Sequence, residues 1–451
     1  VVAGGGPAGI GAALGAAGAG ADVVLVERYG FLGGNATAAL VMPLMSWHNE
    51  VRGARRRGLD EPLRLLPTDH GPGEPVVGGA LLRLMERLLD CGGAVAPTED
   101  TGYTVPFDPE AYKRAALDVL DEAGVRYLLH SFVSGVVEDD ARPAGVVAET
   151  KSGPLALEAP AIVDCTGDGD VAAAAGASYE VGRESDGLVQ PMTLMFRVVG
   201  MERQGFERYV AAHPDQWRGV HGLWDLIEEA REAGELDLPR EDLLFFATPH
   251  EQEVSVNSTR VQHVLGTDVF DLTRAEWLAR RQMDQIMGFL RRRVPGFERA
   301  YAAQSGTHIG VRETRRILGE HYLTGDELLA ARPFDDVIAR GSYPIDIHDP
   351  EGRGTLLRRL PEGGAYDIPL GCLIPRDVDG LLVAGRCISG SHEAHSSYRV
   401  TPIACATGQA AGVCAALAAQ RGCAPREVPA ADVQRVLLEQ GANLGDAVGA
   451  G

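Results

Sequence analysis

The start of the chain alternates apolar runs with a stretch of small residues. An apolar run at residues 1–3 is followed by small residues over 8–20 and by a second apolar run at 22–26. This spacing predicts a strand, a helix and a second strand. Strands that alternate with helices in this way are typical of parallel sheets.

The pattern of strands and helices continues up to residue 170. Apolar positions recur at helical spacing over 79–93 and 108–123, and residues 125–129 form the next apolar run. We expect this run to be the third strand of the same sheet. Short strands separated by turn residues are predicted at 132–138, 144–150, 154–159 and 161–170.

The pattern of apolar and polar positions changes after residue 177. Mixed strand patterns accompany an acidic helix predicted over 224–234 and an arginine-rich helix over 275–294, and a strand at 379–387 returns to the first sheet. We predict an α/β protein whose parallel-sheet domain is interrupted by an inserted α+β domain. The expected boundaries are 1–177 for the first part, with an excursion at 51–107; 178–369 for the insertion; 370–425 for the second part; and 426–451 for a C-terminal tail.

The charge and hydropathy of the chain exclude some classes of partner. The 451 residues include 42 Lys and Arg against 63 Asp and Glu, for a formal net charge of −21. A nucleic-acid partner is not expected, because phosphate neutralisation needs clustered cations. No apolar run approaches the ~20 residues that cross a membrane, so we expect no membrane partner.

The number and spacing of the cysteines indicate free thiols, and not disulfides or a metal site. There are 7 of them, an odd number, and no two have the spacing of a zinc ligand pair. We expect reduced, buried thiols in a cytoplasmic protein, with no metal.

A glycine motif lies between the first strand and the first helix. Gly4, Gly6 and Gly9 form GxGxxG, and Glu27 follows at the end of the second strand. The first glycine permits a tight turn, the second lets the backbone approach a pyrophosphate, and the third lets the helix pack on the sheet. An acidic residue about 20 positions on can accept hydrogen bonds from a ribose. The sequence therefore predicts a dinucleotide site, with a ligand-free glycine turn as the alternative.

A second glycine turn follows Glu27 directly. With Gly33-Gly34-Asn35-Ala36-Thr37 the chain resembles the FAD-dependent oxidoreductases of the glutathione-reductase-like superfamily. The resemblance implies a Rossmann-like FAD-binding domain with a crossover β-meander. It also implies FAD in place of a nicotinamide nucleotide, which would be the simpler interpretation of GxGxxG alone. The cysteine pair of the disulfide reductases is missing after this turn, so a thiol–disulfide relay is not expected.

Two later segments carry the same resemblance. The run at 161–170 is similar to the second flavin motif of the superfamily, through Thr166, Gly167 and Asp168. The stretch at 379–418 resembles the ending of a subgroup related to fumarate-reductase flavoproteins, and 309–317 is similar to a helix of the family. In that ending, Thr401 suits an N-cap and Pro402 a first helical residue. The resemblance places the positive end of this helix at the flavin pyrimidine edge.

The chain departs from the superfamily at several positions. Arg386 stands where many relatives carry an acid for the ribityl hydroxyls. Asn35 and Ala36 stand near the position of the flavin-linked histidine of succinate dehydrogenases, so we expect non-covalent FAD. The GDAAH-type motif of aromatic hydroxylases is missing, which makes a monooxygenase less favoured.

The cofactor-binding residues that these motifs imply come from seven short segments of the chain. They are Gly4, Gly6, Pro7, Ala8, Gly9, Glu27, Arg28, Gly33, Gly34, Asn35, Ala36, Thr37, Val133, Thr166, Gly167, Asp168, Gly385, Arg386, Val400, Thr401 and Ile403.

Five residues are candidates for the chemistry beside the flavin. His395 is the preferred acid or base, because its ordinary pKa lies near neutral pH, and Arg399 is expected to contact the flavin or a substrate carboxylate. His392 is the second histidine candidate, and both histidines have a structural role as the alternative. Arg312, expected on the same helix face as Arg315, is a candidate anion clamp or else an ion-pair partner. Tyr343 is a candidate for the lining of the substrate pocket.

Two hypotheses about function follow. The first is hydride transfer between a small organic substrate and the flavin N5, with NAD(P)H or another electron carrier as a candidate further partner. The second is a flavoprotein that uses FAD structurally or without net redox chemistry, as in an isomerase or dehydratase. The oligomeric state is left open by the sequence.

Overall fold

The structure is a computed structural model, and it describes residues 1–445 except 50–62, 64, 67–72, 100 and 141. Most of the polar stretch at 51–75, predicted as an excursion, therefore lies outside the described residues.

A parallel sheet forms the centre of the molecule, as the spacing of apolar runs predicts. Its strand order is β20-β7-β1-β2-β3, and every neighbouring pair is parallel. Val2 of the central strand pairs with Leu25 on one side and Val163 on the other. The strands are β1 (Val2–Ala3), β2 (Val24–Val26), β3 (Arg126–Leu128), β7 (Ile162–Asp164) and β20 (Leu381–Val383).

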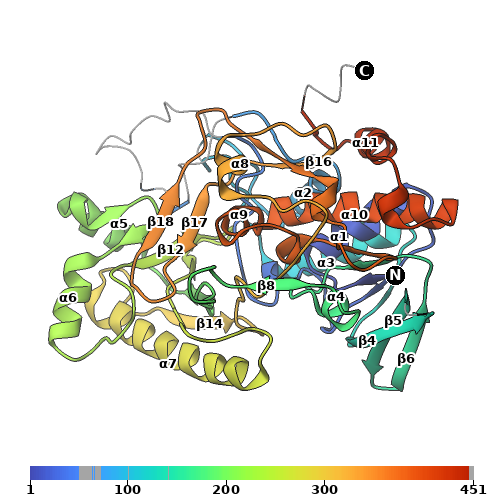
Figure 1. Ribbon diagram of the computed structural model, residues 1–451. Helices are drawn as coiled ribbons and strands as arrows, with labels where there is room; N and C mark the ends of the chain where they lie inside the picture. The colour runs from blue at the N-terminus through green and yellow to red at the C-terminus, as the bar shows by residue number, and fades with distance from the viewer. Residues whose placement is uncertain (50–62, 64, 67–72, 100, 141, 446–451) are drawn as a thin grey trace.

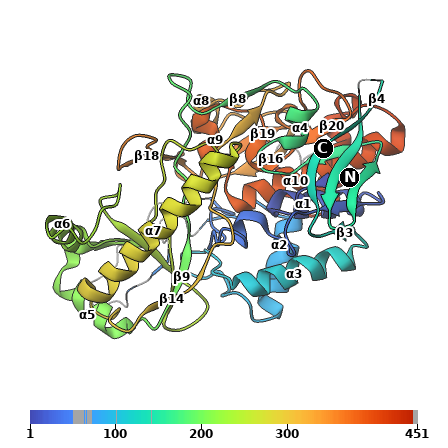
Figure 2. The same cartoon turned by 90° about the horizontal axis from the view of Figure 1, so that it is seen from below.

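Two helices made of small residues pack on each other beside this sheet. They are α1 (Pro7–Gly18) and α10 (Thr401–Arg421), which lie side by side in Figures 1 and 2. A Cβ on Gly408 would lie 2.0 Å from the Ala8 carbonyl oxygen, and one on Gly412 would lie 2.0 Å from that of Ala12. The glycines therefore allow the two backbones to touch.

Contrary to the expectation that no apolar run is of that length, helix α10 is long and apolar enough to cross a membrane, but 89% of its apolar window is buried inside the protein. Burial of this kind is that of a core helix. Helices α2 (Ala80–Asp90), α3 (Pro109–Glu122) and α11 (Ala430–Glu439) complete this region, and the predicted β-meander is present as β4 (Phe132–Asp139), β5 (Arg142–Thr150) and β6 (Gly153–Glu158).

A second sheet lies within the segment predicted as the insertion. It has six strands in the order β10-β11-β12-β13-β9-β14, and its own core packs against the 25-residue helix α7 (Val269–Arg293). The arginine-rich helix predicted over 275–294 is this helix. The strands are β9 (Phe196–Val199), β10 (Trp217–Arg218), β11 (His221–Gly222), β12 (Leu243–Ala247), β13 (Glu253–Val256) and β14 (Tyr301–Ser305), with helices α5 (Arg203–Ala212) and α6 (Trp224–Glu232).

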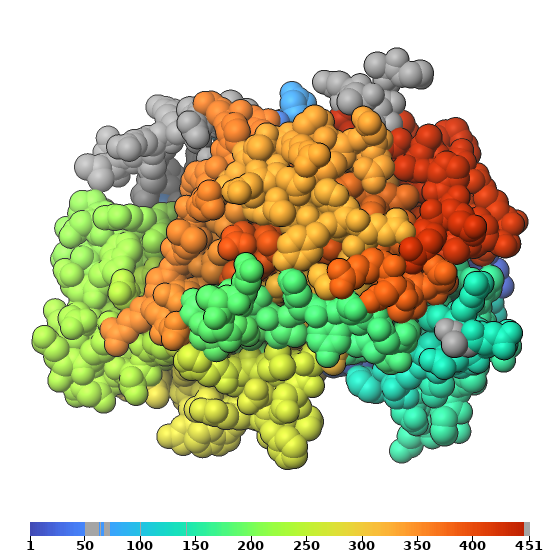
Figure 3. All heavy atoms as spheres, viewed as in Figure 1, coloured from blue at the N-terminus to red at the C-terminus, as the bar shows by residue number. Residues whose placement is uncertain are grey.

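Short elements connect the two regions. Figure 3 shows the green segment around β8 crossing one face between the yellow α7 and the orange and red C-terminal half. Buried side chains from Ile317 to Ile374 belong to the core of the parallel sheet. The predicted boundary at residue 369 remains a prediction. The connecting elements are β8 (Tyr179–Val181), β15 (Arg315–Ile317), β16 (Val337–Gly341), β17 (Ile345–His348), β18 (Thr355–Arg358), β19 (Tyr366–Pro369), α4 (Asp170–Ala174), α8 (Gly325–Leu329) and α9 (His392–Tyr398).

Two local predictions are wrong. Residues 309–317 are extended and end in β15, because Gly310 pairs with Thr193 and β15 pairs with β8, so Arg312 and Arg315 do not share a helix face. Helix α10 has Val400 as its N-cap, with Thr401 as the first helical residue and no side-chain cap hydrogen bond. The backbone of Val400 is extended and its carbonyl accepts the first helical hydrogen bond, from Ala404, which moves the cap one residue towards the N-terminus.

Candidate active site

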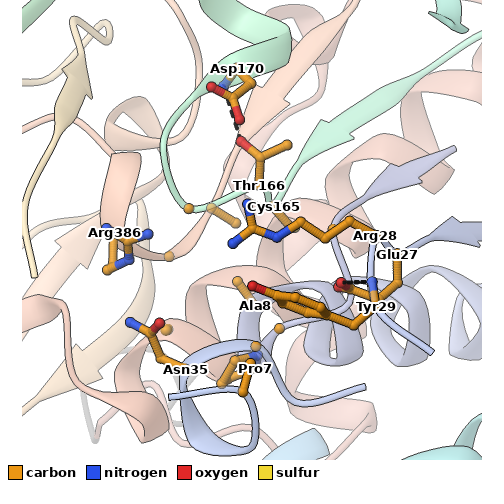
Figure 4. A pocket seen from close by; sticks show the side chains of 18 of the residues that line it. Pro7, Ala8, Glu27, Arg28, Tyr29, Asn35, Cys165, Thr166, Asp170 and Arg386 are labelled. Atoms are coloured by element: carbon orange, nitrogen blue, oxygen red, sulfur yellow. Dashed lines mark hydrogen bonds between the residues drawn. The ribbon is translucent and has the colours of Figure 1, made fainter. Parts of the chain in front are cut away.

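A cavity of about 960 Å³, counting its open mouth, lies at the carboxyl ends of the parallel strands. Its walls come from the loops that follow β1, β2, β7 and β20 and from the start of α10. Figure 4 shows Glu27 and Tyr29 towards one end of this first cavity and Asn35 and Arg386 towards the other. Ligands of open parallel sheets bind at this edge.

Two glycine turns lie against each other beside the first cavity. A Cβ on Gly34, whose φ is +48°, would lie 2.8 Å from the Cα of Gly6. Gly4 has a φ of +101°, and a Cβ there would lie 2.4 Å from the Cys165 carbonyl oxygen. A Cβ on Gly9 would lie 1.8 Å from the Gly4 carbonyl oxygen. The turns therefore keep the backbone bare beside the N-terminus of α1, which suits a pyrophosphate.

Glu27 is buried at the end of the first cavity that lies away from Asn35 and Arg386. Its carboxylate accepts hydrogen bonds from the backbone N–H groups of Gly5 at 2.7 Å and Tyr29 at 2.9 Å. Burial raises the pKa of Glu27, and the backbone hydrogen bonds oppose that shift. The guanidinium of Arg28 lies 4.9 Å from the centre of the Tyr29 ring, which stacks on Phe31. This end of the cavity joins a carboxylate to an aromatic surface, which suits the adenosine part of a dinucleotide.

Arg386 has a donor that the described residues leave without a partner. Its Nη2 donates to Asp168 at 3.0 Å, whereas its Nη1 is buried with no hydrogen-bond partner in the described chain. Asp168 also accepts from the Thr314 hydroxyl at 2.8 Å. A buried donor of this kind is costly unless a ligand pairs with it. The first cavity therefore fits a large, oxygen-rich cofactor such as FAD.

A second, larger cavity of about 1840 Å³, counting its open mouth, adjoins the first. It lies between the start of α10, the extended segment at 309–314 and the edge of the second sheet. Four residues line both cavities: Asn35, Arg386, Arg399 and Thr401.

The comparison with known families agrees with this geometry. A family model described as FAD dependent oxidoreductase matches residues 1–437. The chain belongs to this family. FAD is accordingly the cofactor, and the protein is an enzyme of the flavin-dependent oxidoreductase class. No curated protein matches the chain at a significant level.

Solved structures match the chain over nearly its whole length. A geranylgeranyl bacteriochlorophyll reductase-like protein from Thermoplasma acidophilum is 12% identical, with a TM-score of 0.43 over 97% of this chain and 81% of that chain. A p-nitrophenol 4-monooxygenase from Pseudomonas putida is 11% identical, with a TM-score of 0.44 over 98% and 82%. A myxobacterial chondrochloren halogenase is 14% identical, with a TM-score of 0.43 over 97% and 77%. Likenesses of this size do not decide the reaction.

Most of the FAD-binding residues predicted from the sequence line the first cavity. They are Gly4, Gly6, Pro7, Ala8, Glu27, Arg28, Gly34, Asn35, Val133, Thr166, Gly167, Gly385, Arg386 and Thr401.

The other predicted FAD residues lie behind the lining. Gly9 separates α1 from the sheet, Asp168 holds Arg386, and the Thr37 hydroxyl donates to the Leu32 carbonyl. Val400 lines the second cavity. The remaining three, Gly33, Ala36 and Ile403, lie outside the lining of both cavities.

Three of the predicted catalytic residues meet at the second cavity: Arg312, Tyr343 and Arg399. The Tyr343 hydroxyl donates to Asp346 at 2.7 Å, and Nη2 of Arg399 lies 3.6 Å from the same carboxylate. Asp346 was not singled out from the sequence, although it stands only three residues after Tyr343.

His348 also lines the second cavity, next to Asp346. Nη2 of Arg260 donates to its Nδ1 at 3.2 Å, and its Nε2 lies 3.6 Å from the Asp346 carboxylate. Arginine has no acceptor, so Nδ1 accepts and the hydrogen of the neutral ring is on Nε2. Burial, with repulsion from the surrounding arginines, lowers the pKa of His348 well below its ordinary value. The neutral ring therefore carries its hydrogen on Nε2, which lies just beyond hydrogen-bond distance of Asp346.

The other two predicted catalytic residues lie away from both cavities. His395 is 0% exposed, and neither ring nitrogen has a hydrogen-bond partner in the described chain. His392 Nδ1 lies 2.9 Å from Glu313, which also pairs with Arg316 at 2.6 Å. The expectation that His395 shares a pocket with the start of α10 is not met. Both histidines lie on helix α9, which buries their side chains in the protein interior. Closeness in sequence to the start of α10 therefore does not bring them to the cavities.

Several lining residues were missed by sequence reasoning. His308 lines the first cavity, and burial together with the charge of Arg28 lowers its pKa to about 4. Arg240 lines the second cavity from the far side. Neither belongs to a motif, so only the fold brings them to the site.

Proposed function

We propose that the protein is a dehydrogenase or reductase that transfers a hydride between a small organic substrate and the flavin N5. The observation that carries this proposal is the shared wall of the two cavities, formed by Asn35, Arg386, Arg399 and Thr401. A substrate in the second cavity would meet the cofactor at the start of α10. When bound, FAD would supply a centre that accepts or donates two electrons as a hydride.

The first turn of α10 supports charge stabilisation at this meeting point. Ala404 makes the first helical hydrogen bond, to the Val400 carbonyl, so the N–H groups before it have no intrahelical acceptor. Thr401 and Ala404 both line the first cavity. A helix N-terminus favours negative charge, by up to about 2 kcal/mol in a buried setting. This end of the helix would stabilise an anionic reduced cofactor.

We assign the proton transfer of the reaction to Tyr343 and Asp346. Proton transfer needs a group that faces the substrate and that a second group orients. Tyr343 lines the second cavity, and the Asp346 carboxylate accepts the hydrogen bond of its hydroxyl at 2.7 Å. Asp346 is itself held by the Ser396 hydroxyl, which accepts from the Asp346 backbone N–H at 3.1 Å. Tyr343 Oη would hold the proton, and Asp346 would position it.

Anaerobic addition of candidate metabolites to the FAD-loaded protein tests the proposal. We expect a substrate of the dehydrogenase to bleach the oxidised flavin absorbance without O₂ and without NAD(P)H. In the reductase direction, NAD(P)H or another electron carrier would reduce the flavin and the substrate would reoxidise it. Turnover that needs O₂ together with NAD(P)H would identify a monooxygenase instead. Turnover with no change in flavin absorbance would identify the non-redox use of FAD.

A further inference from the structure

The lining of the second cavity holds two chemically different groups of side chains. We call Arg240, Arg312 and Arg399 the charged wall, and Met195, Val220, Leu244 and Phe246 the apolar wall. The carboxylates of Glu241, Asp242 and Asp346 belong to the same lining. The charged wall stands out because the whole chain carries a net charge of −21.

The charge of Arg312 is only partly offset by a carboxylate, through the longer-range attraction of Asp346. Its Nη1 donates to the Pro191 carbonyl and to the Thr193 hydroxyl, both at 2.6 Å and both neutral. No acidic side chain of the described residues lies within ion-pair distance of it. Burial, followed by repulsion from Arg399, Arg260 and Arg240, lowers the pKa of Arg312 well below its ordinary value.

The neighbouring arginines are only partly compensated. Nε of Arg399 and Nε of Arg240 are buried, and neither has a hydrogen-bond partner in the described part of the chain. Nη2 of Arg399 donates to the Asp346 backbone carbonyl at 3.4 Å and lies 3.6 Å from its carboxylate, while Arg240 pairs with Asp242 at 3.1 Å. Two buried donors therefore remain available on this wall.

Arg260 adds to the positive field from behind the cavity. It is 2% exposed and donates to the carbonyls of Gly352 and Gly354 and to the ring of His348. Burial and the nearby Arg240 lower its pKa to about 10. A buried cation is costly without an opposite charge, so this group of arginines favours an anion in the cavity.

The apolar wall belongs to a small core of its own. Met195, Val220 and Phe246 cluster with Leu40, and Leu244 packs on them. The three are at most 9% exposed, and all three line the cavity. A small dicarboxylate would leave this wall in water, whereas an apolar group would bury it at about 25 cal/mol per Å².

We propose that the second cavity binds an amphipathic organic acid, with its anionic group on Arg312 and Arg399 and its apolar body against Met195, Val220 and Phe246. This inference rests on the proposed function, since it takes the second cavity as the substrate site.

Binding to the oxidised, FAD-loaded protein tests the inference without turnover. The readout is the perturbation of the bound flavin absorbance during titration with 3-phenylpropanoate, its neutral analogue 3-phenylpropanamide, and succinate. We expect 3-phenylpropanoate to bind at least tenfold more tightly than either of the others. Equal binding of the amide would overturn the anion site, and tighter binding of succinate would overturn the apolar wall. Absence of binding by all three up to the millimolar range would also overturn the proposal.

Variants of the two walls separate the contributions. Arg312→Met should weaken 3-phenylpropanoate at least tenfold and leave the amide within twofold. Phe246→Ala should weaken both ligands to a similar degree. Arg293→Met is the matched control, because Arg293 pairs with Glu235 at 2.7 Å outside both cavities, and it should change neither. An unchanged affinity in Arg312→Met would contradict the assignment, and the wild-type comparison of acid with amide decides the question where a variant does not fold.

The outcome is distinguishable from failure of the proposed function. Binding of the acid with no flavin bleaching by any amphipathic acid would keep the binding site and reject hydride transfer. Flavin bleaching by a neutral or dicarboxylic substrate, with no preference for the amphipathic acid, would keep hydride transfer and reject this inference.

Discussion

The hydroxyl of Tyr343 donates a 2.7 Å hydrogen bond to the carboxylate of Asp346 at the wall of the second cavity. Both residues lie where β16 passes into β17, within four positions of each other. The tight spacing fixes the direction of the phenol towards the cavity. A proton-transfer group that is held by a rigid neighbour needs little reorganisation during the reaction.

Tyr343→Phe should slow anaerobic flavin reduction by about 10²–10⁴, the range of a lost general acid or base. The ring remains, so FAD affinity and the melting temperature should stay near those of the wild type. Stopped-flow absorbance with the substrate that bleaches the flavin is the measurement. A rate within threefold of wild type would remove Tyr343 from the proton step.

His395→Leu should leave flavin reduction within about threefold of wild type. The imidazole lines neither cavity, and both of its nitrogens are without a hydrogen-bond partner among the described residues. Replacing an unsatisfied buried polar group by an apolar one of similar shape is nearly neutral or stabilising. Chemical denaturation should therefore show no loss of the free energy of unfolding. A large loss of rate with intact FAD binding would return His395 to the reaction.

Glu27→Ala should weaken FAD binding by about 1.5–3 kcal/mol, which is the value of a hydrogen bond to a charged group. The loss corresponds to a rise in Kd of roughly 10- to 100-fold. Equilibrium titration of the FAD-free protein, followed by flavin fluorescence, measures it. Asp22→Ala is a suitable control, because Asp22 forms an exposed ion pair with Arg126 at 2.8 Å. Equal FAD affinity in Glu27→Ala and the control would show that the carboxylate does not bind the cofactor.

Gly408→Ala should destabilise the fold by about 1–3 kcal/mol, the usual cost of overpacking. The added Cβ would lie 2.0 Å from the Ala8 carbonyl oxygen, so α10 and α1 would have to separate. Gly135→Ala is the matched control, because the nearest atom to its Cβ would be 4.0 Å away. Urea unfolding compares the two variants, and equal midpoints would contradict the close packing of the helices.

His308 predicts a pH dependence for the stability of the FAD-free protein. Its pKa is about 4 in the folded chain against an ordinary 6.5, so the unfolded state binds more protons between these values. Stability must then fall as the pH drops from about 6.5 towards 4. His308→Gln should make this slope shallower, as measured by urea unfolding at several pH values. Identical slopes in variant and wild type would show that His308 does not contribute.

The sequence by itself determined the family of the protein and its cofactor. Gly4, Gly6 and Glu27 lie within one βαβ unit, where local spacing controls the relative position of turn, helix and strand end. Such a motif can be recognised without the rest of the fold, because the contacts that shape it are close in sequence.

Only the tertiary structure decided which residues face the substrate cavity. Arg240, Arg312 and Arg399 are far apart in the chain and belong to no shared motif, yet the fold brings all three to the lining of one cavity. His395 shows the converse, since it lies six residues before Thr401 but a helical turn directs it into the core. The direction of a side chain depends on the helix or strand that carries it and on what packs against that element, and neither is a property of spacing along the chain.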